Sequence, residues 1–164
     1  MLEQRARWKR AEEWLLRWGE NGDLLEEADG VREMLASLDW GSVVSALGAM
    51  CPKHSLTRLL SDDWIDDEIV NMTMHDLAAR VRLDPKLSKT TIVANLALQN
   101  NIRKAFESKD YSKKSAGLLY RYTELFKSGK WKCLYFPTHV DENHWVPMLI
   151  DFEEKTICYG KSCC

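Results

Sequence analysis

The sequence predicts an α+β fold in which a helical N-terminal part is followed by a three-stranded antiparallel meander. Up to about residue 126, apolar residues recur every three or four positions, which is the periodicity of amphipathic helices. Beyond residue 131, three short apolar runs rich in aromatic and branched residues are separated by turn formers, which is typical of buried strands. With 164 residues, 45% of them hydrophobic, the chain is long enough for one domain with a real core.

Residues 1–50 are expected to form a helical extension made of two helices. The first covers residues 4–18 and ends at Gly19, and the second follows a short loop, with Asp23 as its N-cap. Each helix carries one apolar stripe, so the two are expected to form a helical hairpin that packs on the rest of the chain or on a protein partner. Residues 41–52 are expected to be an irregular connector. The two stripes consist of Trp8, Ala11, Leu15 and Trp18, and of Leu24, Ala28, Val31, Leu35 and Leu38.

A longer helix is predicted from about residue 64 to residue 82. Asp62 or Asp63 can cap it, and the acidic residues of its first turn suit the positive end of the helix dipole. The dipeptide Asp84-Pro85 stops it, because the residue before a proline is driven out of the helical region. Its wide apolar face predicts that this helix is well buried.

Two more helices are predicted before the strands. One opens at Ser88, buries Ile92 and Leu96, and fades near residue 108. Residues 107–114 are charged and polar and are expected to form an exposed loop. Residues 118–126 predict the last, short helix.

The strands are predicted at residues 134–136, 145–150 and 156–159, with a turn at residues 153–155. His144 stands where the second strand begins. A histidine in this place is either a loop residue hydrogen-bonded to the backbone or a general base held beside a cleft, and the residues alone leave both open.

Composition excludes several classes of protein. The 23 Lys and Arg residues against 25 Asp and Glu residues give a net charge of −2, which provides no general attraction to nucleic acid. No apolar run approaches the roughly 18 residues of a membrane span, and the first residues lack the apolar core of a secretory signal. Five cysteines without paired spacing indicate a reducing, intracellular location, so nucleus or cytoplasm is expected.

Two blocks of the sequence resemble one family. The upstream block is Leu59-Leu60-Ser61-Asp62-Asp63-Trp64-Ile65-Asp66-Asp67-Glu68-Ile69-Val70-Asn71. The downstream block contains Phe136-Pro137-Thr138, His144-Trp145-Val146, Ile150-Asp151 and Ile157-x-Tyr159-x-x-Ser162. In this order, the two blocks resemble the ubiquitin-like-protease family of papain-like cysteine peptidases, which process and remove SUMO-type modifiers.

The resemblance implies that residues 51–164 form part of a papain-like cysteine protease domain. The activity it implies is that of a cysteine-type peptidase or isopeptidase, a hydrolase that takes part in proteolysis and deSUMOylation. The implied partner is a SUMO-like or related ubiquitin-like modifier, with a possible protein partner for the N-terminal helices. No cofactor and no metal are expected, and neither nucleic acid nor a membrane is an expected partner.

The catalytic residues implied by the resemblance are incomplete. His144 corresponds to the base, but Lys161 stands where the family has the Asp that orients the imidazole. An ammonium group has no acceptor for the imidazole N–H, and it disfavours the imidazolium. Asp151 lies too far along the strand from His144 to replace that Asp, so Asp141 is the conceivable substitute.

The nucleophile is also without a counterpart. The family's oxyanion-hole Gln and nucleophilic Cys follow the Asp by some tens of residues, whereas Cys163 and Cys164 are expected in the turn after the third strand, where no helix terminus lowers a thiol pKa. The chain is therefore expected to be incomplete and inactive as it stands. Pro147 is a further departure, because it removes a ladder donor from an expected inner strand.

The substrate-binding residues implied by the resemblance are present. In this family two tryptophans sandwich the Gly-Gly tail of the modifier, and Trp64 and Trp145 occupy their positions. Asp67 occupies the position of an acidic residue that pairs with a basic residue of the modifier. Two flat aromatic walls admit only a chain without side chains, which fits a glycine tail. The alternative is that both tryptophans are plain core residues.

Three hypotheses for the whole chain stay open: an isopeptidase-family domain that is inactive as this chain, a non-catalytic module that binds a modifier or another protein, and a truncated or decayed gene product. Two other constellations are weaker. Cys133, His139 and His144 do not have a recognised metal-ligand spacing. The terminal Cys163-Cys164 resembles a prenylated end, but it is not a C-a-a-X box.

Overall fold

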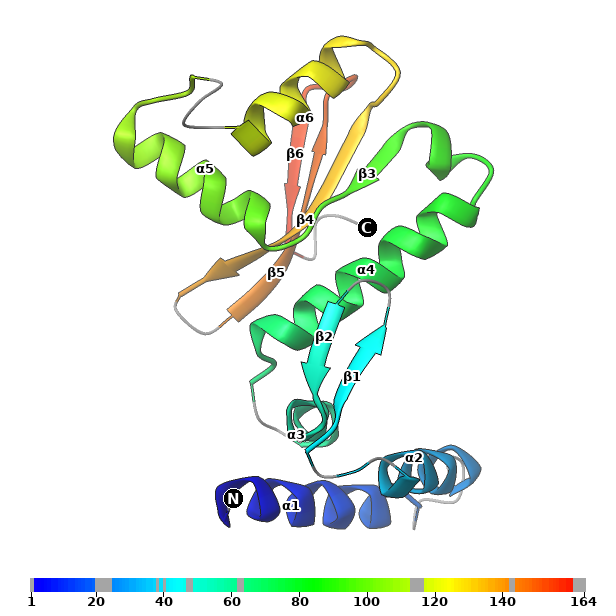
Figure 1. The fold of residues 1–164 in the computed structure, drawn as a ribbon. Helices are drawn as coiled ribbons and strands as arrows, with labels where there is room; N and C mark the ends of the chain where they lie inside the picture. Colours follow the sequence, from blue (N-terminus) through cyan, green and yellow to red (C-terminus); the bar gives the residue numbers. More distant parts are fainter. Residues whose placement is uncertain are drawn as a thin grey trace. The chain divides into compact units, whose positions relative to one another are not determined.

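The computed structural model describes residues 2–19, 25–37, 39, 41–46, 49–61, 64–112, 117–141 and 144–160. The chain divides into two compact units, Met1–Met72 and Thr73–Cys164. The boundary between the units falls inside the helix α4 (Figure 1). The predicted division into residues 1–50 and 51–164 remains a prediction.

The first unit begins with the helices α1 (Leu2–Gly19) and α2 (Leu25–Ser37), as the apolar stripes predict. The two helices pack through Leu15, Ala28 and Leu35, which are only 4–6% exposed. Trp18, expected in the buried stripe, is instead 44% exposed and stacks on Trp14, with 4.9 Å between the ring centroids. The expected cap Asp23 and the stripe residues Leu24 and Leu38 lie outside the described residues.

The prediction of an irregular connector at residues 41–52 is wrong. The strands β1 (Val43–Ala46) and β2 (Ala49–Pro52) form an antiparallel hairpin there, followed by the short helix α3 (Lys53–Leu56) and the 3₁₀ turn η1 (Thr57–Leu60). Each strand has four residues and half of their side chains are small, so the hairpin has little of the β-branched and aromatic content that marks strands in a sequence.

The helix α4 (Asp67–Leu83) begins later than predicted. Its cap is Asp66, whose Oδ1 accepts a hydrogen bond from the N–H of Ile69 at 3.2 Å, while Asp62 and Asp63 lie outside the described residues. The helix ends directly before Asp84-Pro85, as predicted. Asp84 Oδ1 accepts bonds of 2.8 Å from the N–H groups of two following residues, so the same side chain organises the turn that leaves the helix.

The second unit is built on a sheet in the order β3-β4-β5-β6. The strands β4 (Cys133–Val140), β5 (His144–Asp151) and β6 (Thr156–Tyr159) pair consecutively and antiparallel. The strand β3 (Thr91–Val93) adds a fourth, parallel to β4, so the sheet is larger than the expected three-stranded meander.

The strand β3 corrects the prediction of a helix starting at Ser88. Only a 3₁₀ turn, η2 (Leu87–Lys89), forms there, and Ile92 lies in β3 opposite Leu134. Residues 90–93 are four β-branched residues in succession, and such residues lose side-chain freedom in a helix but pack well in a sheet. The helix α5 (Ala97–Ser108) starts only after Asn95, whose Oδ1 accepts the N–H of Ala97 at 3.1 Å.

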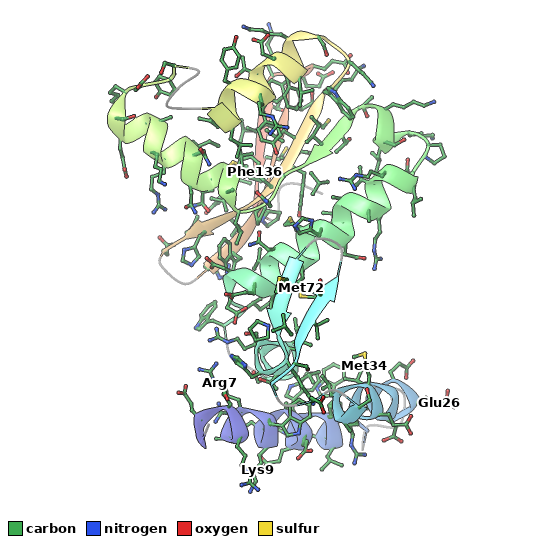
Figure 2. The ribbon with its side chains drawn as sticks, in the orientation of Figure 1. Arg7, Lys9, Glu26, Met34, Met72 and Phe136 are labelled. Carbon is green, nitrogen blue, oxygen red and sulfur yellow. The ribbon has the colours of Figure 1, made fainter. Side chains whose placement is uncertain are left out.

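The helices α5 and α6 (Gly117–Lys127) cover one face of this sheet (Figure 1). The core between them is centred on Leu98 of α5 and on Leu134 and Phe136 of β4, all at most 4% exposed. Figure 2 shows the position of Phe136. Met148 and Ile150 of β5 pack on the same cluster. Across the part of the chain that the structure describes, no helix combines the length and the apolar character that a membrane span requires.

Candidate functional site

The β4–β5 hairpin places His144 and Trp145 at the start of β5. Val140 pairs with His144 and His139 pairs with Trp145, so both predicted site residues lie at the end of the hairpin that carries the turn. Neighbouring residues of a strand point to opposite faces of the sheet. His144 shares the face of Met148, and its side chain is exposed, whereas Trp145 points to the other face and is half-buried.

Trp145 packs on His139 of the neighbouring strand. The ring centroids lie 4.5 Å apart and the ring planes are tilted by 36°. The backbone of His139 is held in turn by Gln99 of α5: the Gln99 Nε2 donates to the His139 carbonyl at 2.9 Å, and the His139 N–H donates to Gln99 Oε1 at 2.8 Å. The sequence brought up His139 only in a weak metal hypothesis and did not point to Gln99, since 40 positions separate the two residues and no local pattern marks their contact.

Pro147 does not interrupt the ladder between β4 and β5. The N–H of Phe152 donates to the carbonyl of Lys132 at 2.8 Å, which makes that pair a hydrogen-bonded one. Antiparallel pairs alternate, so Pro137 opposite Pro147 is a non-hydrogen-bonded pair, and neither proline removes a β4–β5 bond. The missing donor of Pro147 faces the β6 side, one residue beyond the last pair, Met148 with Tyr159. Pro147 thus marks where the pairing of β6 ends.

In the first unit, Trp64 lies in the segment between η1 and α4, with 58% of its surface exposed. Its backbone is held by Arg58, whose Nη1 donates to the Trp64 carbonyl at 3.0 Å. The Nε of the same Arg58 lies 3.3 Å from Oδ2 of Asp66, the cap of α4. Asp67, the first residue of α4, is exposed. An exposed indole and an exposed carboxylate therefore stand together at the start of the helix.

Two of the three cysteines with described positions, Cys51 and Cys133, differ from an activated nucleophile. Cys51 is completely buried, and burial, followed by the nearby carboxylates of Asp66 and Glu68, raises the pKa of its thiol. Burial and the carboxylate of Asp151 likewise raise the pKa of Cys133. A thiol with a raised pKa stays protonated and unreactive near neutral pH. Cys163 and Cys164 lie outside the described residues.

Asp141 and Asp151, two acidic residues of the β4–β5 hairpin, lie at opposite ends of it. Asp151 lies at the opposite end of β5 from His144, where its Oδ1 accepts two hydrogen bonds of 2.9 Å from the N–H groups of Glu153 and Glu154. These bonds, that from Glu154 first, lower the pKa of Asp151 and shape the β5–β6 turn. Asp141 is exposed at the β4–β5 turn with a φ of 50°. Lys161 lies outside the described residues.

The weak metal hypothesis on Cys133, His139 and His144 finds no support in the strand register. Cys133 pairs with Asp151 at one end of the β4–β5 hairpin, whereas both histidines lie at the other end. Among the residues with described positions, no group of three or more His, Cys, Asp or Glu side chains could hold a metal ion.

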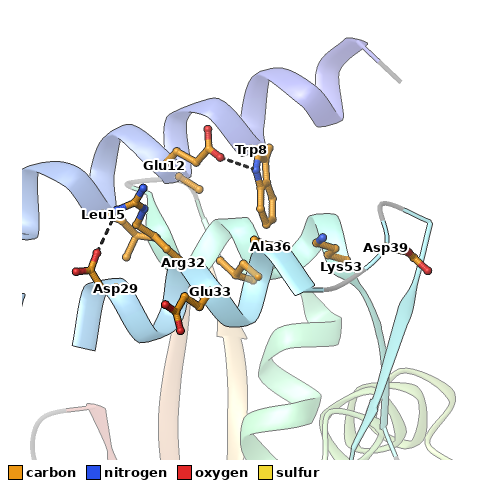
Figure 3. Close-up of a pocket in the computed structure, with 11 residues that line it drawn as sticks. Trp8, Glu12, Leu15, Asp29, Arg32, Glu33, Ala36, Asp39 and Lys53 are labelled. Atoms are coloured by element: carbon orange, nitrogen blue, oxygen red, sulfur yellow. Dashed lines mark hydrogen bonds and ion pairs between the residues drawn. The ribbon is translucent and has the colours of Figure 1, made fainter. Parts of the chain in front are cut away.

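A pocket of about 640 Å³ lies in the first unit between α1, α2 and Lys53 (Figure 3). Its floor is apolar, and its rim carries charges of both signs: Trp8 donates to Glu12 at 3.0 Å, and Arg32 pairs with Asp29 at 3.1 Å. The Lys53 Nζ lies 4.7 Å from the centroid of the Trp8 ring. Three of the charged residues that line this pocket, Glu12, Asp29 and Arg32, thus have a partner within it.

Comparison with known proteins identifies the family. The model of the Ulp1 protease family, C-terminal catalytic domain, matches residues 63–163. This stretch is more than half of the chain and contains both the Trp64 segment and the His144-Trp145 hairpin, so the chain belongs to the Ulp1 protease family. The resemblance found in the sequence is thereby confirmed. No curated protein matches the chain.

Solved structures of the same family share the fold. A C-terminal Ulp1 protease domain in complex with Smt3, the yeast ortholog of SUMO, is 17% identical with a TM-score of 0.52, over 80% of this chain and 53% of that one. The SUMO protease Ulp1 with its catalytic cysteine oxidised to a sulfenic acid is 18% identical with a TM-score of 0.51, over 80% and 52%. The sulfonic acid form is 19% identical with a TM-score of 0.51, over 80% and 53%. The chain thus spans about half the length of these structures.

Proposed function

We propose that this chain is the modifier-recognising part of a cysteine peptidase domain and that residues 1–164 bind a SUMO-like modifier without cleaving it. The observation that carries the proposal is the exposed indole of Trp64 beside the exposed carboxylate of Asp67, on a segment anchored by Arg58. The resemblance assigns contact with the Gly-Gly tail to Trp64 and to Trp145, and it assigns pairing with a basic residue of the modifier to Asp67. The Ulp1 domain of similar fold was solved with a SUMO ortholog bound.

The chemistry favours binding over hydrolysis. Thiol catalysis needs a thiolate, a base and an acceptor that orients the base. His144 supplies a base, but the position of the orienting acid holds Lys161, whose ammonium group cannot accept a hydrogen bond. Cys51 and Cys133 have raised thiol pKa values, which opposes formation of a thiolate.

Peptidase activity is the second candidate, and family membership together with the exposed His144 at the start of β5 favours it. In that reaction a thiolate attacks the carbonyl carbon of the modifier's terminal glycine, and the imidazolium of the base gives its proton to the leaving amine. Asp141, in the turn that precedes β5, would then have to orient His144 in place of the family acid.

Titration with a mature SUMO-type modifier tests the proposal by calorimetry. Trp64→Ala removes an exposed aromatic anchor, so affinity is expected to fall about thirtyfold, or by about 2 kcal/mol. His144→Ala is expected to bind like the wild type. Trp18→Ala, which removes an exposed indole of α1, serves as the matched control and is expected to bind normally.

A precursor-cleavage assay on the same proteins separates the remaining hypotheses. Cleavage that disappears in His144→Ala would replace the binding proposal by the peptidase. Neither binding nor cleavage by the wild type would reject both and favour a gene product without either activity.

A further inference from the structure

In the described part of the chain, the edge of β4 that pairs with β3 has no neighbouring strand beyond Tyr135. Ala94 N–H, directly after β3, donates to the Tyr135 carbonyl at 2.8 Å, and the chain then turns into α5. The next residues of β4 that face this edge are Pro137 and His139, because backbone groups alternate sides along a strand. Pro137 has no N–H to offer there. His139 has both a donor and an acceptor at an edge that β3 no longer covers.

The side chain of Gln99 binds the backbone groups of His139 that β3 leaves uncovered. A primary amide presents one donor and one acceptor much as a peptide group does, and Gln99 uses both on the same residue, His139, at 2.9 Å and 2.8 Å. The helix that carries Gln99 is fixed at this point, since the adjacent Leu98 is 1% exposed in the core under the sheet. The side-chain amide of Gln99 therefore takes the place of a neighbouring strand at His139, and the helix α5 holds this amide in a fixed position.

His139, whose backbone Gln99 binds, is also the residue against which Trp145 packs. His139 and Trp145 form a non-hydrogen-bonded pair, in which opposite side chains come closest, and their rings lie 4.5 Å apart. We propose that Gln99 and His139 are positioning residues that set the orientation of the Trp145 indole for the tail of the modifier. This inference rests on the function proposed above, and it extends the recognition surface to two residues that the family motifs do not include.

Two variants of Gln99 remove the contact to different extents. Gln99→Met keeps the length of the side chain but has neither an N–H nor a carbonyl. Gln99→Glu keeps an acceptor for the His139 N–H but loses the donor to the His139 carbonyl. The matched control is Asn101→Ala on the same helix, since the Asn101 amide bonds at 2.6 Å to the carbonyl of Ala97 within α5 and does not reach β4.

The readout is the indole N–H resonance of Trp145 in the free protein, assigned among the seven tryptophans by Trp145→Phe. The resonance is expected to move in Gln99→Met and Gln99→Glu and to stay in Asn101→Ala. Gln99→Met, which loses both hydrogen bonds to His139, is expected to weaken modifier binding about tenfold.

Each outcome decides the inference. An unchanged Trp145 resonance in Gln99→Met would overturn it, even if affinity fell, because the effect would then not pass through the indole. Should Gln99→Met fail to fold, Gln99→Glu gives the same decision with one bond retained. A wild-type chain that does not bind the modifier would refute the proposed function, while the resonance would still show whether Gln99 positions Trp145.

Discussion

Replacing Arg58 by Met tests how the segment before α4 presents Trp64. The Arg58 side chain is 26% exposed, and its guanidinium holds the Trp64 carbonyl at 3.0 Å and the Asp66 carboxylate at 3.3 Å. A hydrogen bond from a charged donor contributes about 1.5–3 kcal/mol, and a partly exposed ion pair adds roughly 0.5 kcal/mol. Since Asp66 still caps α4 in the variant, the lower end of the range for the charged hydrogen bond applies. Modifier affinity is therefore expected to fall about tenfold.

The assay is a double-mutant cycle on modifier binding with Arg58→Met, Trp64→Ala and the double variant. If Arg58 acts by holding Trp64, its substitution costs about tenfold in the wild-type background and less than about twofold once the indole is gone. An equal loss in both backgrounds would refute this reasoning. Arg80→Met is the matched control, because its ion pair with Asp76, at 2.6 Å, lies on the exposed surface of α4, with the Arg80 side chain 75% exposed.

Phe136→Ala is expected to lower the free energy of unfolding by about 3–5 kcal/mol, and the exposed Leu83→Ala by less than about 0.5 kcal/mol, measured by chemical denaturation. Pro147→Ala is expected to leave hydrogen-exchange protection between β4 and β5 unchanged, and lost protection there would contradict the assigned ladder. The N–H of Leu87 lowers the pKa of Asp84, so Asp84→Ala is expected to be less stable than the wild type at neutral pH. That difference disappears as pH falls below the ordinary value of about 3.9 and through the lowered pKa, and a difference that persists in acid would contradict this cause.

The helices and long strands could be predicted because their apolar patterns are local. The stripes of α1 and α2 and the apolar run of β5 each point to one structure without reference to the rest of the chain. The strand β3 could not be placed from helical spacing, since Ile92 and Leu96 fit a helix as well as a strand followed by a helix. Its β-branched run decides for the strand, and pairing with β4 stabilises it.

The sequence offers candidate site residues only where they follow a family motif. Trp64, Asp67, His144 and Trp145 come from two continuous blocks of sequence, and the match at residues 63–163 covers all four residues. Gln99 leaves no trace in the sequence, because it acts on a backbone 40 residues away. Proline at position 147 predicts an interrupted ladder between β4 and β5. The register shows instead that the missing N–H of Pro147 lies on the side of β5 that faces β6.

The most direct test of modifier recognition is calorimetric titration with two forms of one SUMO-type modifier, differing only in the terminal Gly-Gly. The intact form is expected to bind, and the form without the two glycines is expected to lose most of its affinity, because the proposed function assigns the tail as the part of the modifier that the exposed indole of Trp64 contacts. Equal affinity for both forms would contradict the account, since the modifier would then be held through its globular surface and not through its tail.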